Sequence, residues 1–341
     1  MTSISRKVYR INPGSMKSLK ITEESLDGPA KGEVRVAIKA IGLNFADVFS
    51  VWKLYSAIPK GAFIPGLEYA GEVESVGEGV TSLKPGDRVM GICRFGAYSS
   101  HLNIDARYLI NLPADWSYEE GASYLVQSLT AYYALMDLGG LKENKTVLVH
   151  SAAGGVGTYA NRIAKKMGAY TIGTVGSASK VDYCKKEGYD EVIVRDNKNF
   201  GPQLEKVLGD RPLDLILECI GGPVLKAGYV SLAEQGRMVV YGSAYYASDR
   251  DKPRFIDLFL KYKRRPMIDP QQMIQFNKGI LGFNLIYLYE RVELMHQLLG
   301  ELSTLNLDKP TVGEVFTFEN LPDALRLFRT GKTIGKVVVT I

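Results

Sequence analysis

The stretch VLVHSAAGGVG, residues 147–157, reads as a buried strand, a turn of small residues and the start of a helix. Gly154 and Gly157 fill the last two places of a G-x-G-x-x-G pattern, with Ala152 in the first. A turn this small lets backbone N–H groups and a helix N-terminus approach a pyrophosphate closely. We therefore expect a dinucleotide-binding site and redox chemistry, with cofactor contacts from Ala153, Gly154, Gly155, Val156 and Gly157.

The residues after the turn support this interpretation. Apolar side chains recur at helical spacing between Val156 and Met167, and Gly168 follows as a helix end. Residues 170–175, YTIGTV, then read as the next strand. A strand, a turn, a helix and a strand in this order predict one parallel βαβ unit. The alternative is a tight turn of the same shape that holds no ligand.

The end of the second predicted strand distinguishes between the two pyridine dinucleotides. Proteins that prefer NAD place an acid there, on the ribose 2′-OH, whereas this chain has GSASK at residues 176–180. Ser177, Lys180 and Arg195 offer a hydroxyl and two cations that could bind a 2′-phosphate. The sequence therefore favours NADPH. The alternative is that Lys180 is an ordinary solvated helix residue.

The composition is that of an ordinary α/β globular protein. The 341 residues suffice for two domains, and 46% of them are hydrophobic. The net charge of +5 does not call for nucleic acid, and the basic run at residues 261–265 is typical of a solvated face. Three widely separated cysteines indicate a reducing compartment. Residues 1–13 lack the apolar core of a signal peptide, and no apolar run is long enough to span a membrane, so we expect a soluble cytoplasmic protein.

The remaining chain divides into a β-rich part and alternating strands and helices. Ser117, with Glu120 three residues later, forms a capping-box pattern for a helix that we expect to reach residue 138. Residues 245–278 are polar, basic and proline-containing and look like an insertion. The segments that we expect to be regular are strands at 34–40, 69–76, 213–220, 237–242, 280–288 and 335–341, and a helix at 291–302.

Short motifs spread over nearly the whole chain resemble the quinone oxidoreductase branch of the medium-chain dehydrogenase/reductase superfamily. They are GLNFAD at 42–47, LY at 54–55, PGLEYAG at 65–71, GDRV at 86–89, AAGGVG at 152–157 and GKVV at 335–338. SASK at 177–180 and GFNL at 282–285 are similar to the synaptic vesicle amine transport protein homologue subgroup.

The resemblance implies an α/β fold with two domains. One is a Rossmann domain with a doubly wound parallel sheet, residues 127–287, and the other a β-rich GroES-like barrel domain, residues 1–126 and 288–341, that carries the catalytic residues. It also implies a homodimer joined through the strand near residues 280–288.

Zinc alcohol dehydrogenases of this superfamily place a cysteine where Asn44 stands, a histidine where Leu67 stands and a second cysteine near Gln127. None of these ligands is present here, although Glu68 remains beside Leu67. A catalytic zinc needs three protein ligands of N, S or O type, so we expect no metal site, and the missing ligands oppose the interpretation as a zinc alcohol dehydrogenase. His150 is expected to be a packing residue.

Without a metal, the acceptor must itself be electrophilic, as quinones and α,β-unsaturated carbonyls are, and the protein must orient it and offer a donor to its oxygen. The resemblance places Asn44 and Tyr55 in these catalytic roles, while Asp47 is expected to hold loop backbone. It also places further residues around the cofactor, with a surface role as the alternative for Lys336: Thr130, Gly242, Ser243, Phe283 and Lys336. Trp52, Tyr55, Phe63 and Tyr69 could line an apolar cleft or belong to the core.

Two functions follow as hypotheses. The first is an NADPH-dependent, zinc-independent reductase of small quinones or enones. The second is a low-turnover NADPH-binding protein with a membrane- or partner-binding role, which the subgroup resemblance and the basic run at 261–265 suggest. Contact with a membrane is not expected under the first hypothesis.

Overall fold

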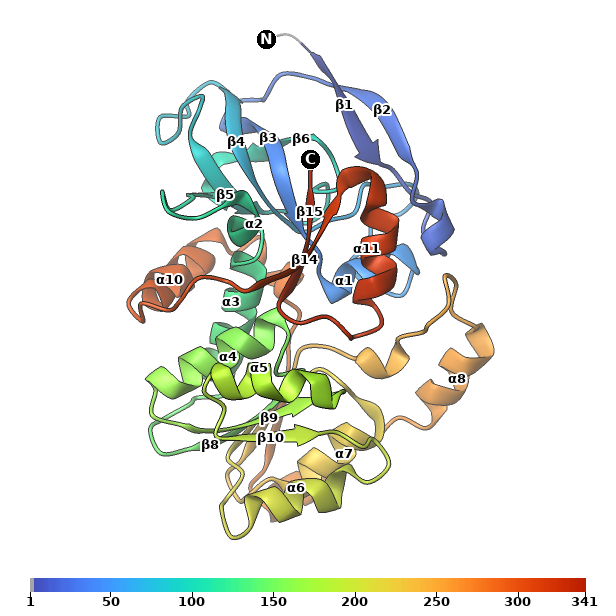
Figure 1. Cartoon of the computed structure of the whole chain (residues 1–341), viewed down its shortest axis with the longest axis vertical. Helices are drawn as coiled ribbons and strands as arrows, with labels where there is room; N and C mark the ends of the chain where they lie inside the picture. Colours follow the sequence, from blue (N-terminus) through green and yellow to red (C-terminus); the bar gives the residue numbers. More distant parts are fainter. Residues whose placement is uncertain (1–2) are drawn as a thin grey trace.

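The computed structural model describes residues 3–341, so Met1 and Thr2 of the predicted N-terminal segment lie outside the described residues. The lower half of the molecule in Figure 1 is built on a six-stranded sheet, in which every neighbouring pair is parallel. Its strand order is β10 (Glu191–Val194), β9 (Tyr170–Val175), β8 (Thr146–His150), β11 (Leu215–Glu218), β12 (Arg237–Val240) and β13 (Gly279–Gly282).

Helices cover both faces of this sheet, as a doubly wound fold requires. Figure 1 shows α4 (Gly155–Lys166) and α5 (Val181–Lys186) above it and α6 (Phe200–Leu208) and α7 (Gly222–Ser231) below it. Strand β8, helix α4 and strand β9 form the βαβ unit that the sequence predicts.

The upper half contains a seven-stranded sheet. Its strand order is β14 (Val312–Thr317), β15 (Lys336–Thr340), β3 (Glu33–Gly42), β4 (Glu68–Val76), β5 (Arg88–Ile92) and β7 (Leu109–Asn111), and β6 (His101–Asp105) also pairs with β3. Strands β1 (Ile4–Tyr9) and β2 (Ile21–Leu26) form a separate antiparallel hairpin. The strand predicted at residues 335–341 is observed as β15 and returns to the sheet formed by the first part of the chain, because it pairs antiparallel with β3, as the red and blue strands of Figure 1 show.

Short helices complete this half and join it to the other. They are α1 (Phe45–Val51), α2 (Tyr118–Gly121), α3 (Leu125–Tyr132), α10 (Val292–Ser303) and α11 (Leu321–Phe328). Single helical turns lie at η1 (Met16–Ser18), η2 (Ala106–Tyr108), η4 (Ala178–Lys180), η5 (Ala244–Tyr246), η6 (Leu285–Leu288) and η7 (Phe318–Asn320).

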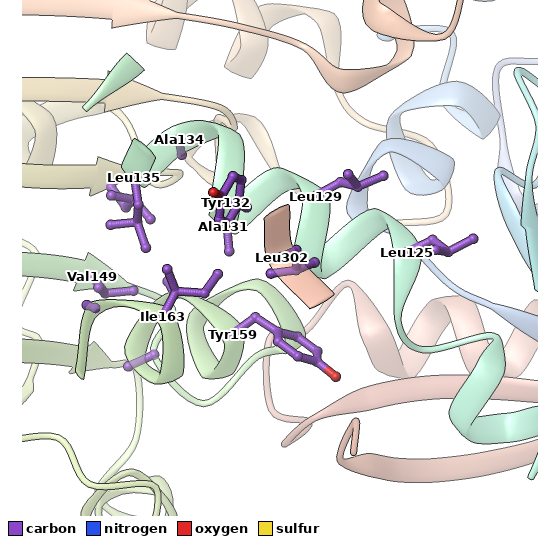
Figure 2. Packing of buried hydrophobic residues seen from close by; sticks show 14 of the residues in the cluster. Leu125, Leu129, Ala131, Tyr132, Ala134, Leu135, Val149, Tyr159, Ile163 and Leu302 are labelled. Carbon is purple, nitrogen blue, oxygen red and sulfur yellow. The ribbon is translucent and has the colours of Figure 1, made fainter. Parts of the chain in front are cut away.

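One apolar cluster extends across both halves. Figure 2 shows Tyr132 of α3 over Ile163 of α4, with Leu302 of α10 between α3 and Tyr159, and Leu129 belongs to the same cluster. These side chains are at most 7% exposed. The packing places α3, which leads out of the upper half, directly against the helix that begins at the glycine turn.

Two sequence predictions need correction. The helix expected from Ser117 to residue 138 is divided into three segments. Ser117 caps the short helix α2, and a new helix, α3, starts at Leu125, where Glu68 Oε1 accepts the N–H of Val126 at 2.9 Å. A π-helical segment, η3 (Tyr133–Leu138), follows α3. The strand expected at 280–288 ends at Gly282, because the chain there leaves the sheet and turns toward Tyr55.

The region predicted as an insertion, residues 245–278, contains α8 (Phe255–Lys263) and α9 (Pro270–Gln275) between β12 and β13. None of the helices within residues 3–341 combines the length and the apolarity that crossing a bilayer requires.

Candidate active site

A cleft of about 1320 Å³ lies where the two halves meet. Residues from both contribute to its wall, including the α1 region, the glycine turn after β8, the ends of β9, β10 and β12, and the loop before β15. All the residues that the sequence analysis assigns to catalysis or cofactor binding line this cleft: Asn44, Tyr55, Thr130, Ala153, Gly154, Gly155, Val156, Gly157, Ser177, Lys180, Arg195, Gly242, Ser243, Phe283 and Lys336. Their contacts with a ligand stay predictions.

The glycine turn leaves backbone donors open toward this cleft. The first intrahelical bond of α4 is donated by Thr158 to the carbonyl of Gly154, so the N–H groups of residues 155–157 precede it. A Cβ atom at Gly157 would lie 2.5 Å from the carbonyl oxygen of Ser151, which excludes a side chain there. An anion such as a pyrophosphate fits this turn, because the open donors and the helix dipole both favour negative charge.

The two cations predicted at the phosphate end of the cleft, Lys180 and Arg195, have different surroundings. Arg195 donates from Nη1 to Thr174 Oγ1 at 3.1 Å and from Nε to Asn197 Oδ1 at 2.8 Å. Lys180 donates to the carbonyls of Gly331 and Thr333, both at 2.6 Å. The alternative that Lys180 is an ordinary solvated helix residue is wrong, because the residue is only 7% exposed. Burial lowers the pKa of Lys180, and the positive charge of Arg195 acts in the same direction.

These lysine contacts reveal a part of the cleft that the sequence analysis missed. Residues 329–333 line it beside Ser177, and Lys180 ties this loop to the end of β9. Lys332 brings a further cation to the same wall. A lysine in a loop remote in sequence from the glycine turn gives no signal of this proximity in the sequence.

The floor of the cleft is a buried polar network around Asn44. Its Oδ1 accepts from Gln127 Nε2 and from Lys336 Nζ, both at 2.9 Å, and its Nδ2 donates to the carbonyl of Gly42. Lys336 Nζ also lies 2.8 Å from Glu68 Oε2. The surface role considered for Lys336 is wrong, since the residue is 3% exposed.

The network is linked directly to the glycine turn. Gly335 donates its N–H to the carbonyl of Ala153, in the glycine turn, at 2.8 Å. Lys336 is the next residue in the chain, so this hydrogen bond fixes the backbone beside the network. Asp47 has the predicted backbone role, because its Oδ2 accepts the N–H of Asn44 at 2.8 Å. Burial raises the pKa of Asp47 to about 7, against the lowering effects of the Asn44 N–H and Lys336.

Tyr55 lines the cleft from the loop after α1. Its hydroxyl donates to Asn284 Oδ1 at 2.7 Å, and Ser56 Oγ lies 3.0 Å from Tyr287 Oη. Burial raises the pKa of Tyr55 to about 12, although the hydrogen bond with Asn284 acts to lower it. Asn284 also lines the cleft. It occupies the variable position of the GFNL motif, which is why the sequence pattern did not single it out.

The other aromatic residues considered for the cleft wall belong elsewhere. Trp52, Phe63 and Tyr69 are at most 5% exposed and lie in the core of the seven-stranded sheet. Trp52 Nε1 donates to the carbonyl of Asp251. Of Trp52, Tyr55, Phe63 and Tyr69, only Tyr55 lines the cleft.

His150 is more than a packing residue. Its Nδ1 lies 2.8 Å from Thr174 Oγ1 and its Nε2 lies 3.3 Å from Glu218 Oε2, with all three residues fully buried. The sequence gives no sign that a histidine at the end of β8 contacts a carboxylate at the end of β11, three strands further along the chain, so this contact depends on the tertiary fold.

The residues at the floor do not fit a zinc ion. Asn44, Leu67 and Gln127 offer no thiolate or imidazole, and Glu68 is engaged by the Lys336 ammonium and the N–H of Val126. Within residues 3–341, no three histidine, cysteine, aspartate or glutamate side chains are grouped so as to hold a metal ion.

Comparison with known proteins defines the class. The Zinc-binding dehydrogenase family matches residues 155–298 and the Alcohol dehydrogenase GroES-like domain matches residues 30–114. The chain therefore belongs to the medium-chain dehydrogenase/reductase superfamily, a superfamily of oxidoreductases, and groups with its VAT-1 homologues.

The relatives place it more closely. It is 33% identical over 314 residues to the synaptic vesicle membrane protein VAT-1 homolog of Rattus norvegicus, covering 91% of this chain and 77% of that protein. The Escherichia coli quinone oxidoreductase complexed with NADPH superposes with a TM-score of 0.83 and 27% identity, covering 99% of this chain and 100% of the other. A mycobacterial protein complexed with NADPH gives a TM-score of 0.84 and 26% identity over 98% of this chain and 100% of its own.

Proposed function

We propose that this protein is an NADPH-dependent reductase that transfers a hydride to a quinone or an α,β-unsaturated carbonyl without a metal ion. The observation that carries the proposal is the single cleft that unites the glycine turn with Asn44 and Tyr55. The NADPH complexes of the Escherichia coli and mycobacterial neighbours support it.

Under this proposal the cofactor extends along the cleft. The N–H groups of residues 155–157 hold the pyrophosphate, and Ser177 and Arg195 hold the 2′-phosphate. The nicotinamide half lies among residues from both halves of the molecule: Thr130, Gly242, Ser243, Phe283 and Lys336. Reduced nicotinamide, when bound, supplies the hydride.

The chain's own residues orient the acceptor and stabilise its charge. Because its pKa of about 12 keeps Tyr55 protonated, its hydroxyl can donate to the acceptor oxygen in place of Asn284. Lys336 places a positive charge at the floor, where it favours negative charge developing on that oxygen. Asn44 orients the ammonium and keeps one amide hydrogen for a ligand.

Loss of NADPH absorbance with a panel of small ortho-quinones, para-quinones and enones tests the activity. We expect turnover with at least one acceptor and a lower KM for NADPH than for NADH. Calorimetry that detects no binding of either pyridine nucleotide would overturn the proposal. Binding of NADPH without turnover of any acceptor in the panel would exclude the reductase activity and favour the second candidate function, described below.

We also propose that the domains are divided as the resemblance implies, at residues 126/127 and 287/288, and that two copies pair through β13. This strand lies at one end of the six-stranded sheet and pairs there with β12. An open strand edge is suited to pairing with another chain. Sedimentation equilibrium is expected to give a dimer, and a monomer at micromolar concentration would overturn the proposed pairing through β13.

We also place the protein in the cytoplasm, and cell fractionation tests this location.

The surface of α8 favours a second candidate function, reversible binding to an anionic membrane. Phe255, Ile256, Phe259 and Leu260 are 79%, 61%, 47% and 44% exposed, and the basic run at residues 261–265 continues from them. Exposed apolar and basic residues on one helix are typical of membrane-surface binding. Cosedimentation with anionic but not neutral vesicles, lost in Phe255→Ser/Phe259→Ser, would support this candidate, and no cosedimentation would exclude it.

A further inference from the structure

Four polar residues form a line across the carboxyl ends of neighbouring parallel strands. Glu218 ends β11, His150 ends β8, Thr174 lies one residue before the end of β9, and Arg195 directly follows β10. These strands are consecutive in the sheet, and His150 and Thr174 are register partners. Arg195 lines the cleft, whereas Glu218, His150 and Thr174 are fully buried.

Hydrogen-bonding capacity gives the line a direction. A guanidinium only donates, so Thr174 Oγ1 accepts from Arg195 Nη1 at 3.1 Å. The threonine hydroxyl can then donate to His150 Nδ1, 2.8 Å away, which leaves the imidazole proton on Nε2, facing Glu218 Oε2 at 3.3 Å. Neither of these last two atoms has another hydrogen-bond partner within residues 3–341.

The far end of the line is a fixed negative charge. Glu218 Oε1 accepts the N–H groups of Ile220 and Gly221, which holds the carboxylate in place. Burial acts to raise the pKa of Glu218, but His150 and these two N–H groups outweigh it, so the pKa lies below its ordinary range. The charge of Glu218 also acts on Arg195, where it opposes the lowering of the pKa by burial.

At the cleft end of the line, Arg195 is held by two uncharged oxygen atoms and by no carboxylate among the described residues. Thr174 engages Nη1 and Asn197 engages Nε, and Nη2 has no hydrogen-bond partner among the described residues. A guanidinium held at two nitrogens loses less freedom when a phosphate binds than one that must first be ordered.

We infer that Thr174, His150 and Glu218 are positioning residues that hold Arg195 ready for the 2′-phosphate and so set the preference for NADPH over NADH. This rests on the proposed function, since it concerns the same cofactor. The inference gives Thr174, His150 and Glu218 a role in cofactor selection although these residues do not line the cleft themselves. They act through Arg195, which does.

The test is the binding of NADPH and NADH to Thr174→Val, which keeps the shape of the side chain and removes the hydroxyl. We expect the Kd for NADPH to rise about tenfold, as for the loss of one charge-assisted hydrogen bond, with the Kd for NADH and kcat unchanged. Thr174→Ser restores the hydroxyl and should restore NADPH binding. Thr171→Val is the matched control, because Thr171 is a buried threonine of the same strand whose hydroxyl contacts Asp190.

A double-mutant cycle shows whether Thr174 acts through Arg195. In Arg195→Ala, a further Thr174→Val change should leave NADPH binding unaltered. Glu218→Gln provides a second variant should Thr174→Val not fold, and it should weaken NADPH binding alone, about threefold.

Equal effects of Thr174→Val on both nucleotides, or a full effect in the Arg195→Ala background, would overturn the inference while leaving the proposed function intact. A wild-type protein that binds neither nucleotide would instead overturn the proposed function.

Discussion

The Lys336 ammonium lies 2.8 Å from Glu68 Oε2, although the two side chains are 3% and 0% exposed. The pair joins β15 to β4 across the intervening strand β3 and places the cation below the cleft. Burial lowers the pKa of Lys336, while the negative charge of Glu68 acts to raise it. The pair therefore links the last strand of the chain to the site.

Breaking this pair should destabilise the protein strongly. Lys336→Met leaves the Glu68 carboxylate buried without its cation, and we expect a loss of about 3–5 kcal/mol in the free energy of unfolding in urea. Lys336→Met/Glu68→Gln should recover part of the loss. Lys309→Met, which breaks the solvent-exposed pair with Asp115, is the control and should change stability little. Equal effects of the two lysine substitutions would contradict a buried, stabilising pair.

Asp47 should make stability depend on pH in a defined range. Its folded-state pKa of about 7 is above the ordinary value of 3.8, so the folded state holds a proton that the unfolded state releases earlier. This contribution is complete below pH 3.8 and is lost as pH rises to about 7, with a slope of at most about 1.4 kcal/mol per pH unit.

Asp47→Asn cannot ionise and keeps an oxygen for the N–H of Asn44. Its unfolding free energy relative to wild type should therefore increase between pH 4 and pH 7 and then level off, as measured by urea unfolding at several pH values. A constant difference over this range would show that Asp47 does not titrate there.

The two cations near the 2′-phosphate position should behave differently. Arg195→Ala removes a charge from the cleft wall, and we expect the KM for NADPH to rise about 10- to 100-fold with little change for NADH. Lys180→Met should weaken both nucleotides to a similar, several-fold extent, because it releases the loop at residues 329–333. Steady-state kinetics with both nucleotides measures these effects. Selective loss of NADPH binding in Lys180→Met would instead support the direct contact between Lys180 and the 2′-phosphate that the sequence predicts.

Tyr55→Phe tests the proposed proton donor. Removing the hydroxyl should lower kcat about 100-fold with a quinone acceptor and leave the Kd for NADPH unchanged, because the donor acts on the acceptor oxygen. Asn284→Ala removes the present partner of the hydroxyl and serves as the control, with a smaller expected effect on kcat. An unaltered kcat in Tyr55→Phe would assign the residue to packing.

Local patterns were sufficient for the elements whose form depends on near neighbours in sequence. Residues 170–175 form the predicted strand β9, and the helix predicted at residues 291–302 is observed as α10 (Val292–Ser303). Ser117 caps a helix as its capping box indicates, but that helix ends after one turn because Glu68, remote in sequence, supplies the start of the next.

The site was predicted only in part, for a related reason. Asn44, Tyr55 and the glycine turn were identified because each is part of a short motif, and all line one cleft. The partners that set their chemistry were not: Asn284 for Tyr55, Glu68 for Lys336, and His150 with Glu218 behind Thr174.

The sequence alone determined the βαβ unit around the glycine turn, the C-terminal strand and the absence of the usual zinc ligands, because these depend on residue types at short spacing. Only the tertiary structure decided that Lys336 is buried beside Glu68, that Lys180 binds loop carbonyls and that Arg195 is held through Thr174. Such contacts join strands separated by tens to hundreds of residues, and the burial that gives them their strength arises only when both sheets have assembled.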